Sequence, residues 1–145
     1  MRFTRIAWPL LAAVVIAVVG CSGRKPTYPV TGKVVYKDDG SPAAAGVHVL
    51  FEATTEPYER SMSVIKNDGS FTLSTDRPDN GAIQGEHRAC IQPLAADGSG
   101  GDLTLVLSKK IDPKYFELRT SGLKFDIKSN AKNEFVIRVE RPKRS

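Results

Sequence analysis

The sequence has few of the residues that most often carry out chemistry. Of its 145 residues only two are cysteine and two are histidine. The histidines, His48 and His87, are 39 residues apart, and no His-x-His pair occurs. Gly-x-Ser-x-Gly, His-Glu-x-x-His and phosphate-binding-loop motifs are also absent. We therefore expect no enzyme activity, no catalytic residue, no cofactor and no bound metal.

The central part of the chain also lacks a basic surplus. The whole sequence has 21 basic and 16 acidic residues, a formal charge of +5. Six of the basic residues lie near the two ends, so 15 basic face 16 acidic residues between Tyr28 and Pro142; the six are Arg2, Arg5, Arg24, Lys25, Lys143 and Arg144. Nucleic-acid binding needs clustered lysine and arginine. This balance excludes nucleic acid from the expected partners.

No apolar run is long enough to span a bilayer as a helix. The longest, Ile6–Val19, has fourteen residues with Pro9 among them, whereas a spanning helix needs about 20. It follows two arginines and precedes the small residue Gly20, the order found in an export signal. We expect residues 1–20 to be a signal peptide. The 125 residues that remain suffice for one domain and are too few for two.

The end of this signal, Val18-Val19-Gly20-Cys21, resembles the lipobox of bacterial lipoproteins. The resemblance implies cleavage between Gly20 and Cys21 and acylation of Cys21, so a membrane is an expected partner. Two or three acyl chains would hold the protein firmly, since each buried methylene contributes about 0.8 kcal/mol. Ser22 stands where Asp would retain a lipoprotein in the inner membrane of Gram-negative bacteria, which implies the outer membrane. Residues 21–27 would then form a lipidated tether.

Past this tether no segment offers a helical stripe of ten residues, and apolar residues recur with a period of two. In Leu123–Lys128, for example, Leu123, Phe125 and Ile127 fall on one face and three charged residues on the other. The same pattern, with flanking turn residues, predicts further strands in segments 30–36, 47–53, 61–66, 70–74, 86–92, 103–108 and 134–140.

Turn residues join two pairs of these segments. Asn67-Asp68-Gly69 separates 61–66 from 70–74, and Ser129–Asn133 separates 123–128 from 134–140, so each pair is expected to form a hairpin. Many short strands with frequent turns are typical of sandwiches and barrels. We interpret the body as an all-β fold, an antiparallel Greek-key β-sandwich of seven to eight strands.

The order of several motifs resembles that of carboxypeptidase regulatory-like domains, as found in small bacterial lipoproteins. These motifs are Tyr28–Tyr36, Gly40–Pro42, Gly46–Phe51, Asn67–Leu73, Asp79–Glu86, Ile111–Tyr115, Thr120–Leu123 and Asn133–Phe135. The resemblance implies an immunoglobulin- or transthyretin-like Greek-key sandwich at residues 28–141, followed by a basic tail at 142–145. It implies no catalysis.

The reactive side chains that do occur have simple structural interpretations. His48 is expected on the surface, and His87 is in phase with inward residues, where the resembled domains usually have a Tyr; a site shared by both histidines is the alternative. Cys90 alternates with the polar residues Glu86, Arg88 and Gln92, which places it on the polar face, where Arg88 would lower its pKa a little. With Cys21 acylated, Cys90 has no disulfide partner within the chain. The acidic turns 38–40 and 67–69 supply too few oxygens for calcium.

Three functional hypotheses follow. The first is a non-enzymatic module of the bacterial cell envelope, anchored by lipid at Cys21, that binds a protein or glycan partner through loops away from its tether. The second is a purely structural envelope lipoprotein without a specific ligand. The third is a metal-dependent enzyme centred on His87.

Overall fold

Strands form where the alternating pattern predicts them, with one exception. The computed structural model describes residues 23–99 and 101–143. In these residues the longer strands are β2 (Val30–Tyr36), β3 (His48–Ala53), β4 (Arg60–Val64), β7 (Gly85–Gln92), β8 (Leu123–Ile127) and β9 (Asn133–Val139). The shorter ones are β1 (Thr27–Tyr28), β5 (Ser70–Thr72) and β6 (Ala82–Ile83).

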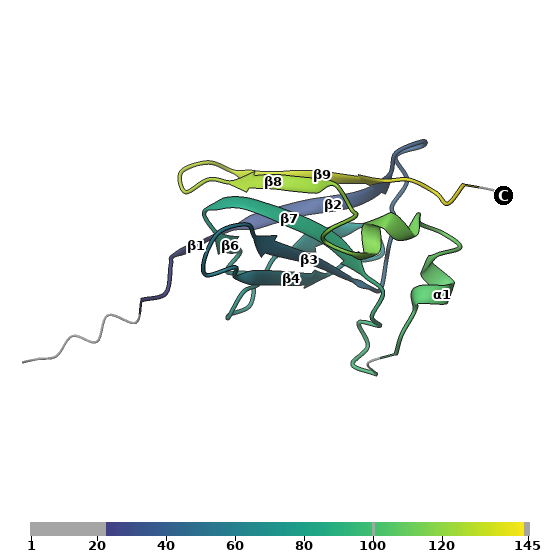
Figure 1. The fold of residues 1–145 in the computed structure, drawn as a ribbon, viewed down its shortest axis with the longest axis horizontal. Helices are drawn as coiled ribbons and strands as arrows, with labels where there is room; N and C mark the ends of the chain where they lie inside the picture. The colour runs from purple at the N-terminus through teal and green to yellow at the C-terminus, as the bar shows by residue number, and fades with distance from the viewer. Residues whose placement is uncertain (1–22, 100, 144–145) are drawn as a thin grey trace, which may run out of the picture.

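Two sheets pack face to face and confirm the predicted β-sandwich (Figure 1). One has the strand order β5-β2-β9 and the other β4-β3-β7-β8, while β1 and β6 form a separate ribbon. All these strand pairs are antiparallel except β2 and β9, which are parallel. The expectation of purely antiparallel pairing is therefore wrong for β9, because the chain crosses from β8 at the edge of one sheet to the edge of the other.

Phenylalanine rings from both sheets fill the space between them. Phe51 of β3 lies 6.1 Å from Phe71 of β5 and 5.2 Å from Phe125 of β8, measured between ring centroids. Phe135 of β9 lies 4.9 Å from Phe125. Aromatic pairs at such distances contribute about 0.5–1.5 kcal/mol beyond the area they bury. These contacts join the two layers into one core.

Of the two predicted hairpins, 61–66 with 70–74 forms in part and 123–128 with 134–140 does not pair, although both turns form. The Lys66 N–H donates to the Ser70 carbonyl, and Met62 and Ser74 exchange backbone hydrogen bonds, but β4 otherwise pairs with β3 in one sheet and β5 with β2 in the other. In the same way β8 pairs with β7 and β9 with β2. Each connection crosses between the layers, because both neighbouring strands have an apolar face to bury and the two sheets bury theirs against each other.

The exception among the predicted strands is segment 103–108, which contains the short helix α1 (Thr104–Leu107). Leu107 is buried and Leu103 packs against the core, while Leu105 between them is exposed. The inward-facing leucines are therefore four residues apart, as in a helix, and not two apart, as in a strand. A 3-10 helix, η1 (Pro113–Phe116), follows. Both helices of the described residues are only four residues long, and neither approaches the length of a transmembrane span.

The sandwich has two different ends. The first described residues and the β1–β6 ribbon lie at one end, on the left in Figure 1, and α1 and the described C-terminal residues lie toward the other. Strand β7 connects the two ends, starting at Gly85 beside β6 and reaching Gln92 seven residues later. At about 3.3 Å per residue it spans roughly 25 Å. We call the segments 93–99 and 101–112, at the end opposite residues 23–28, the distal end.

Candidate functional site

The predicted lipidation site lies outside the described residues, as do the signal peptide, Gly20, Cys21 and Ser22. The tether residues that are described contact the sandwich. Arg24 Nη1 lies 2.9 Å from a carboxylate oxygen of Asp76, and Lys25 Nζ donates to the Glu56 carbonyl at 2.8 Å. Thr27 pairs with Ile83, so backbone pairing begins one residue before the predicted domain start at Tyr28.

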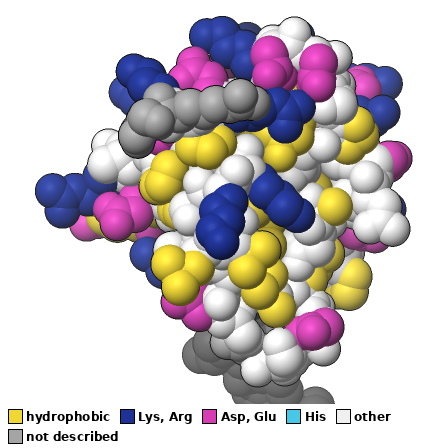
Figure 2. Space-filling model, turned by 90° about the vertical axis from the view of Figure 1, so that its right-hand side faces the viewer, with side chains coloured by type: hydrophobic (Ala, Val, Ile, Leu, Met, Phe, Trp, Pro, Cys, Tyr) yellow, Lys and Arg dark blue, Asp and Glu magenta, His cyan; other side chains and the backbone are white. Residues whose placement is uncertain are grey.

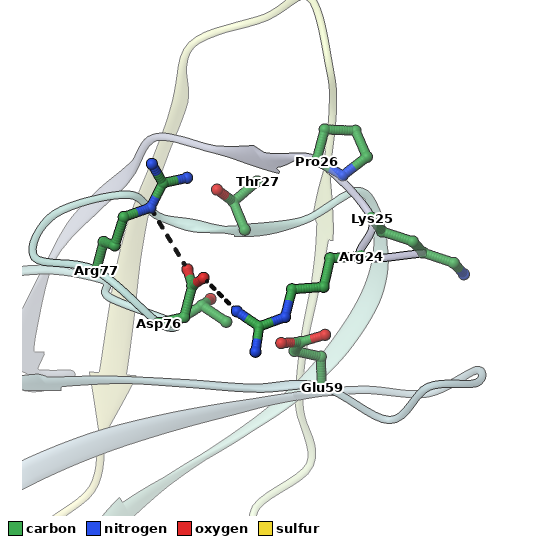
Figure 3. A pocket seen from close by; sticks show the side chains of 8 residues that line it. Arg24, Lys25, Pro26, Thr27, Glu59, Asp76 and Arg77 are labelled. Atoms are coloured by element: carbon green, nitrogen blue, oxygen red, sulfur yellow. Dashed lines mark hydrogen bonds and ion pairs between the residues drawn. The ribbon is translucent and has the colours of Figure 1, made fainter. Parts of the chain in front are cut away.

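Figure 3 shows the shallow pocket of about 340 Å³ that these residues form. Asp76 is its central anion, 2.9 Å from Arg24 and 3.9 Å from Arg77. A hydrogen bond from Asn80, together with the two arginines, holds the pKa of Asp76 below its usual value. Because its two arginines pair with Asp76 and Lys25 donates to the Glu56 carbonyl, the visible role of this pocket is to hold the start of the described chain against the sandwich.

The two histidines do not share a site. His48 is opposite Gln92 and His87 is opposite Ala53, so they lie at opposite ends of the paired strands β3 and β7. Five residue steps along β3 separate the two positions, which corresponds to about 17 Å. His87 faces the core and is fully buried, whereas His48 is partly exposed and its Nδ1 lies 3.4 Å from the Leu94 carbonyl oxygen. The alternative of a shared histidine site is therefore wrong.

His87 has the surroundings of a neutral core residue. Its Nδ1 lies 3.0 Å from the Gly85 carbonyl oxygen, which requires the proton to be on Nδ1. Its Nε2 is buried without a hydrogen-bond partner, and its ring lies 6.5 Å from that of Phe51. Burial lowers the pKa of His87 and keeps the ring uncharged near neutral pH. Within residues 23–99 and 101–143 no group of three or more His, Cys, Asp or Glu side chains could hold a metal ion.

Cys90 is buried, not exposed on a polar face. It does point to the outer side of its sheet, but the segment Phe116–Arg119 lies over that side and lines one groove with it. Burial, with a smaller effect from Glu52, raises the pKa of the Cys90 thiol to about 11. The expectation that Arg88 lowers this pKa is therefore wrong. No sequence pattern predicts that Phe116–Arg119 covers this face of the sheet.

The groove beside Cys90 has a volume of about 410 Å³ and contains a small ion network. Glu52 accepts a hydrogen bond of 2.7 Å from Arg60 Nε and lies 3.7 Å from Arg88 Nη2. The Glu52 side chain is only 13% exposed, so the two arginines compensate the carboxylate's loss of water. No nucleophile with an adjacent base occurs in the groove, because the thiol is protonated and neither described histidine lines the groove.

The carboxylates of the acidic turns accept hydrogen bonds from within the turns, as the sequence predicts. Asp39 and Asp68 each accept hydrogen bonds from the backbone N–H and hydroxyl of the serine two residues later. The hydrogen bond from that serine hydroxyl is the largest cause of the lowered pKa of each carboxyl group. Asp38 and Asp39 also form ion pairs with Arg141.

The distal end presents the strongest candidate for a binding surface. Leu105 and Val106 of α1 are 81% and 55% exposed, and Leu94 is 43% exposed. Leu94 pairs with Asp102 through an isolated bridge, which ties its loop to the start of α1. Lys109 and Lys110 follow α1, are exposed, and make no ion pair within the described residues. Figure 2 shows hydrophobic side chains around two basic ones on this side of the molecule.

Comparisons with known proteins show a partial likeness to a solved structure and no family. No family model matches the chain, and no curated protein matches it. The chain is similar to a solved structure described as a DUF3823 family protein from Parabacteroides merdae ATCC 43184, with 11% sequence identity and a TM-score of 0.43. The match covers 82% of this chain and 47% of the other, so this chain spans about half the length of that protein.

Proposed function

We propose that the chain is a carboxypeptidase regulatory-like lipoprotein of the bacterial cell envelope, anchored at Cys21 in the outer membrane. In this proposal it is not an enzyme and binds a protein or glycan partner through its distal end. The observation that carries the proposal is the exposure of Leu94, Leu105 and Val106 at the end of the sandwich opposite the start of the described chain.

Two further observations support this proposal. A single water-exposed leucine is common, but several large exposed apolar side chains at one end of a molecule mark a surface that another molecule can cover. The tether enters at the opposite end, where Arg24 and Lys25 contact the sandwich. A lipid at Cys21 would therefore leave the distal end directed away from the membrane.

The test compares matched surface variants in whole cells after mild crosslinking and pull-down. We expect a reproducible partner that is lost with Leu105→Asp and retained with Val64→Asp, because Val64 is also exposed, at 41%, but lies on β4. Failure to recover any reproducible partner would remove the basis of the proposal. A deletion phenotype that Leu105→Asp fully rescues would instead favour the structural role.

The anchor is tested separately by mass spectrometry of the mature N-terminus. The proposal predicts a chain that starts at Cys21 and carries acyl groups, and processing that the inhibitor globomycin blocks. A free, unacylated N-terminus would contradict the anchor without bearing on the distal surface.

A further inference from the structure

Strand β9 has a free edge over most of its length. It is the last strand of the order β5-β2-β9. The Val139 carbonyl accepts from Lys37 N–H, next to β2, so Val139 and every second residue before it turn their backbone groups toward β2. Glu134, Val136 and Arg138 consequently turn theirs toward the open edge. The edge ends at Glu140, whose carbonyl accepts from the Asp112 N–H.

Charged side chains along this edge have opposite signs at equal distances from Val136. Two residues away on either side are the exposed Glu134 and Arg138. Four residues away are Lys132, which forms an ion pair with Glu134, and the partly exposed Glu140, which forms ion pairs with Lys37 and Lys114. Val136 itself is 46% exposed. If a second copy of β9 lay antiparallel with Val136 opposite Val136, each of these charges would face its opposite. The strand is thus complementary to itself in this one arrangement.

Strand β8, at the neighbouring edge of the other sheet, has the same property. Lys124 and Asp126 flank Phe125 and are exposed, so an antiparallel copy centred on Phe125 would also pair opposite charges. The Phe125 and Phe135 ring centroids are 4.9 Å apart. Because the centres of the two strands lie at the same level, one two-fold axis could pass close to both.

We propose that the chain forms a two-fold symmetric dimer in which the free edges of two β9 strands pair antiparallel about Val136. Backbone groups of Glu134, Val136 and Arg138 then form hydrogen bonds with those of the second copy. The two three-stranded sheets become one continuous sheet of six strands. This proposal does not depend on the distal surface or on the lipid anchor.

The charges also disfavour the neighbouring registers. Sliding the second strand by two residues in one direction places Lys132 opposite Arg138, and in the other direction Glu134 opposite Glu140. A slide of one residue turns every side chain to the wrong face. Charges on an edge strand usually prevent pairing with other chains. Here their order permits a second copy in a single register.

The register is tested by cysteine crosslinking of the full-length chain in intact cells. Residues opposite each other in a hydrogen-bonded antiparallel pair have Cα atoms about 5.5 Å apart, which a disulfide can span. Under mild oxidation, Val136→Cys should therefore give at least about tenfold more covalent dimer than Val64→Cys. Val64 is the matched control because it is similarly exposed and lies in the edge strand β4. Equal yields from the two variants would overturn the proposal.

Charge exchange provides the second measurement. Adding Glu134→Arg to Val136→Cys places like charges opposite each other, and the dimer yield should fall about tenfold. Adding Arg138→Glu as well restores opposite charges and should restore the yield. Both residues are exposed, so folding should be unaffected. The dimer would be contradicted if the single exchange left the yield unchanged, or if the double exchange failed to restore it. Neither result would bear on partner binding at the distal end.

Discussion

His87 buries a ring nitrogen without a hydrogen-bond partner, a cost that an apolar side chain at this position would avoid. Its Nε2 has no partner and its ring lies against Phe51. Burial lowers its pKa in the folded state from 6.5, so below that pH the unfolded chain binds a proton that the folded chain does not bind. Stability attributable to this residue is complete above pH 6.5 and is lost as the pH falls from there toward the lower folded pKa.

The first prediction concerns this pH dependence. The free energy of unfolding of the wild type should fall as the pH is lowered below about 6.5, by at most about 1.4 kcal/mol per pH unit from this residue. His87→Phe should remove that part of the slope. Urea unfolding at several pH values measures it, with His48→Phe as the control. An unchanged slope in His87→Phe would show that His87 binds its proton as readily in the folded protein as in the unfolded chain.

Cys90 shows how a covering segment decides the chemistry of a residue. Its pKa is raised from 9.0 to about 11, which reduces the thiolate about a hundredfold at any pH well below both values. We predict that iodoacetamide labels Cys90 at least about a hundredfold more slowly in the folded chain than in urea. Peptide mass spectrometry follows the reaction at that residue. Comparable labelling in both states would mean that Phe116–Arg119 does not cover the thiol.

At the scale of the elements, local alternation predicts strands well where a strand has one buried face and one exposed face. β2 and β9, for example, bury every second residue. Sheet membership does not follow from the same pattern. Both β4–β5 and β8–β9 are joined by good turns, yet each pair is divided between the two sheets. A turn only connects two successive strands. Which sheet each strand joins depends on long-range packing, such as that of Phe51 against Phe71 and Phe125.

The same limit applies to the candidate site. In segment 103–108 the leucines alternate, and only the fold shows that Leu103 and Leu107 face inward together while Leu105 is exposed. The sequence could therefore predict a binding surface in a loop region, but not which residues form it. The separate roles of His48 and His87 could be expected, since their strand phases already place them on different faces.

Gly32 provides a test of the packing between the sheets. A Cβ atom at this position would lie 2.5 Å from both the Phe135 carbonyl oxygen and Phe71 Cζ. We predict that Gly32→Ala lowers the free energy of unfolding by about 1–3 kcal/mol, because overpacking must displace a ring or a strand. Gly23→Ala is the control, since no atom lies within 4 Å of its added Cβ. Equal urea midpoints for the two variants would contradict the close packing of β2 against β5 and β9.

At the scale of the whole molecule, the two ends of the sandwich differ in chemistry. The end near residues 23–28 has paired charges, with Arg24 and Arg77 around Asp76. The distal end has exposed apolar side chains and unpaired lysines. A molecule held to a membrane at the first end and bound to a partner at the second would use both features.

Membrane attachment gives a prediction at this scale. Cys21→Ser should move the protein from the detergent-soluble membrane fraction to the aqueous fraction, because the acyl chains of the proposed anchor would be lost. Cys90→Ser is the control and should stay in the membrane fraction. Fractionation followed by immunoblotting distinguishes the two. If Cys21→Ser remains in the membrane fraction, the proposed anchor is wrong.

The most direct test of the account is photocrosslinking at single residues in living cells. A photoreactive amino acid at Leu105 probes the distal end, and one at Tyr58, which is 53% exposed and belongs to the loop that Lys25 contacts, probes the opposite end. We predict a discrete adduct from Leu105 that disappears with Val106→Asp, and no such adduct from Tyr58. The same adducts from both positions, or an adduct at Leu105 that persists with Val106→Asp, would contradict partner binding at the distal end.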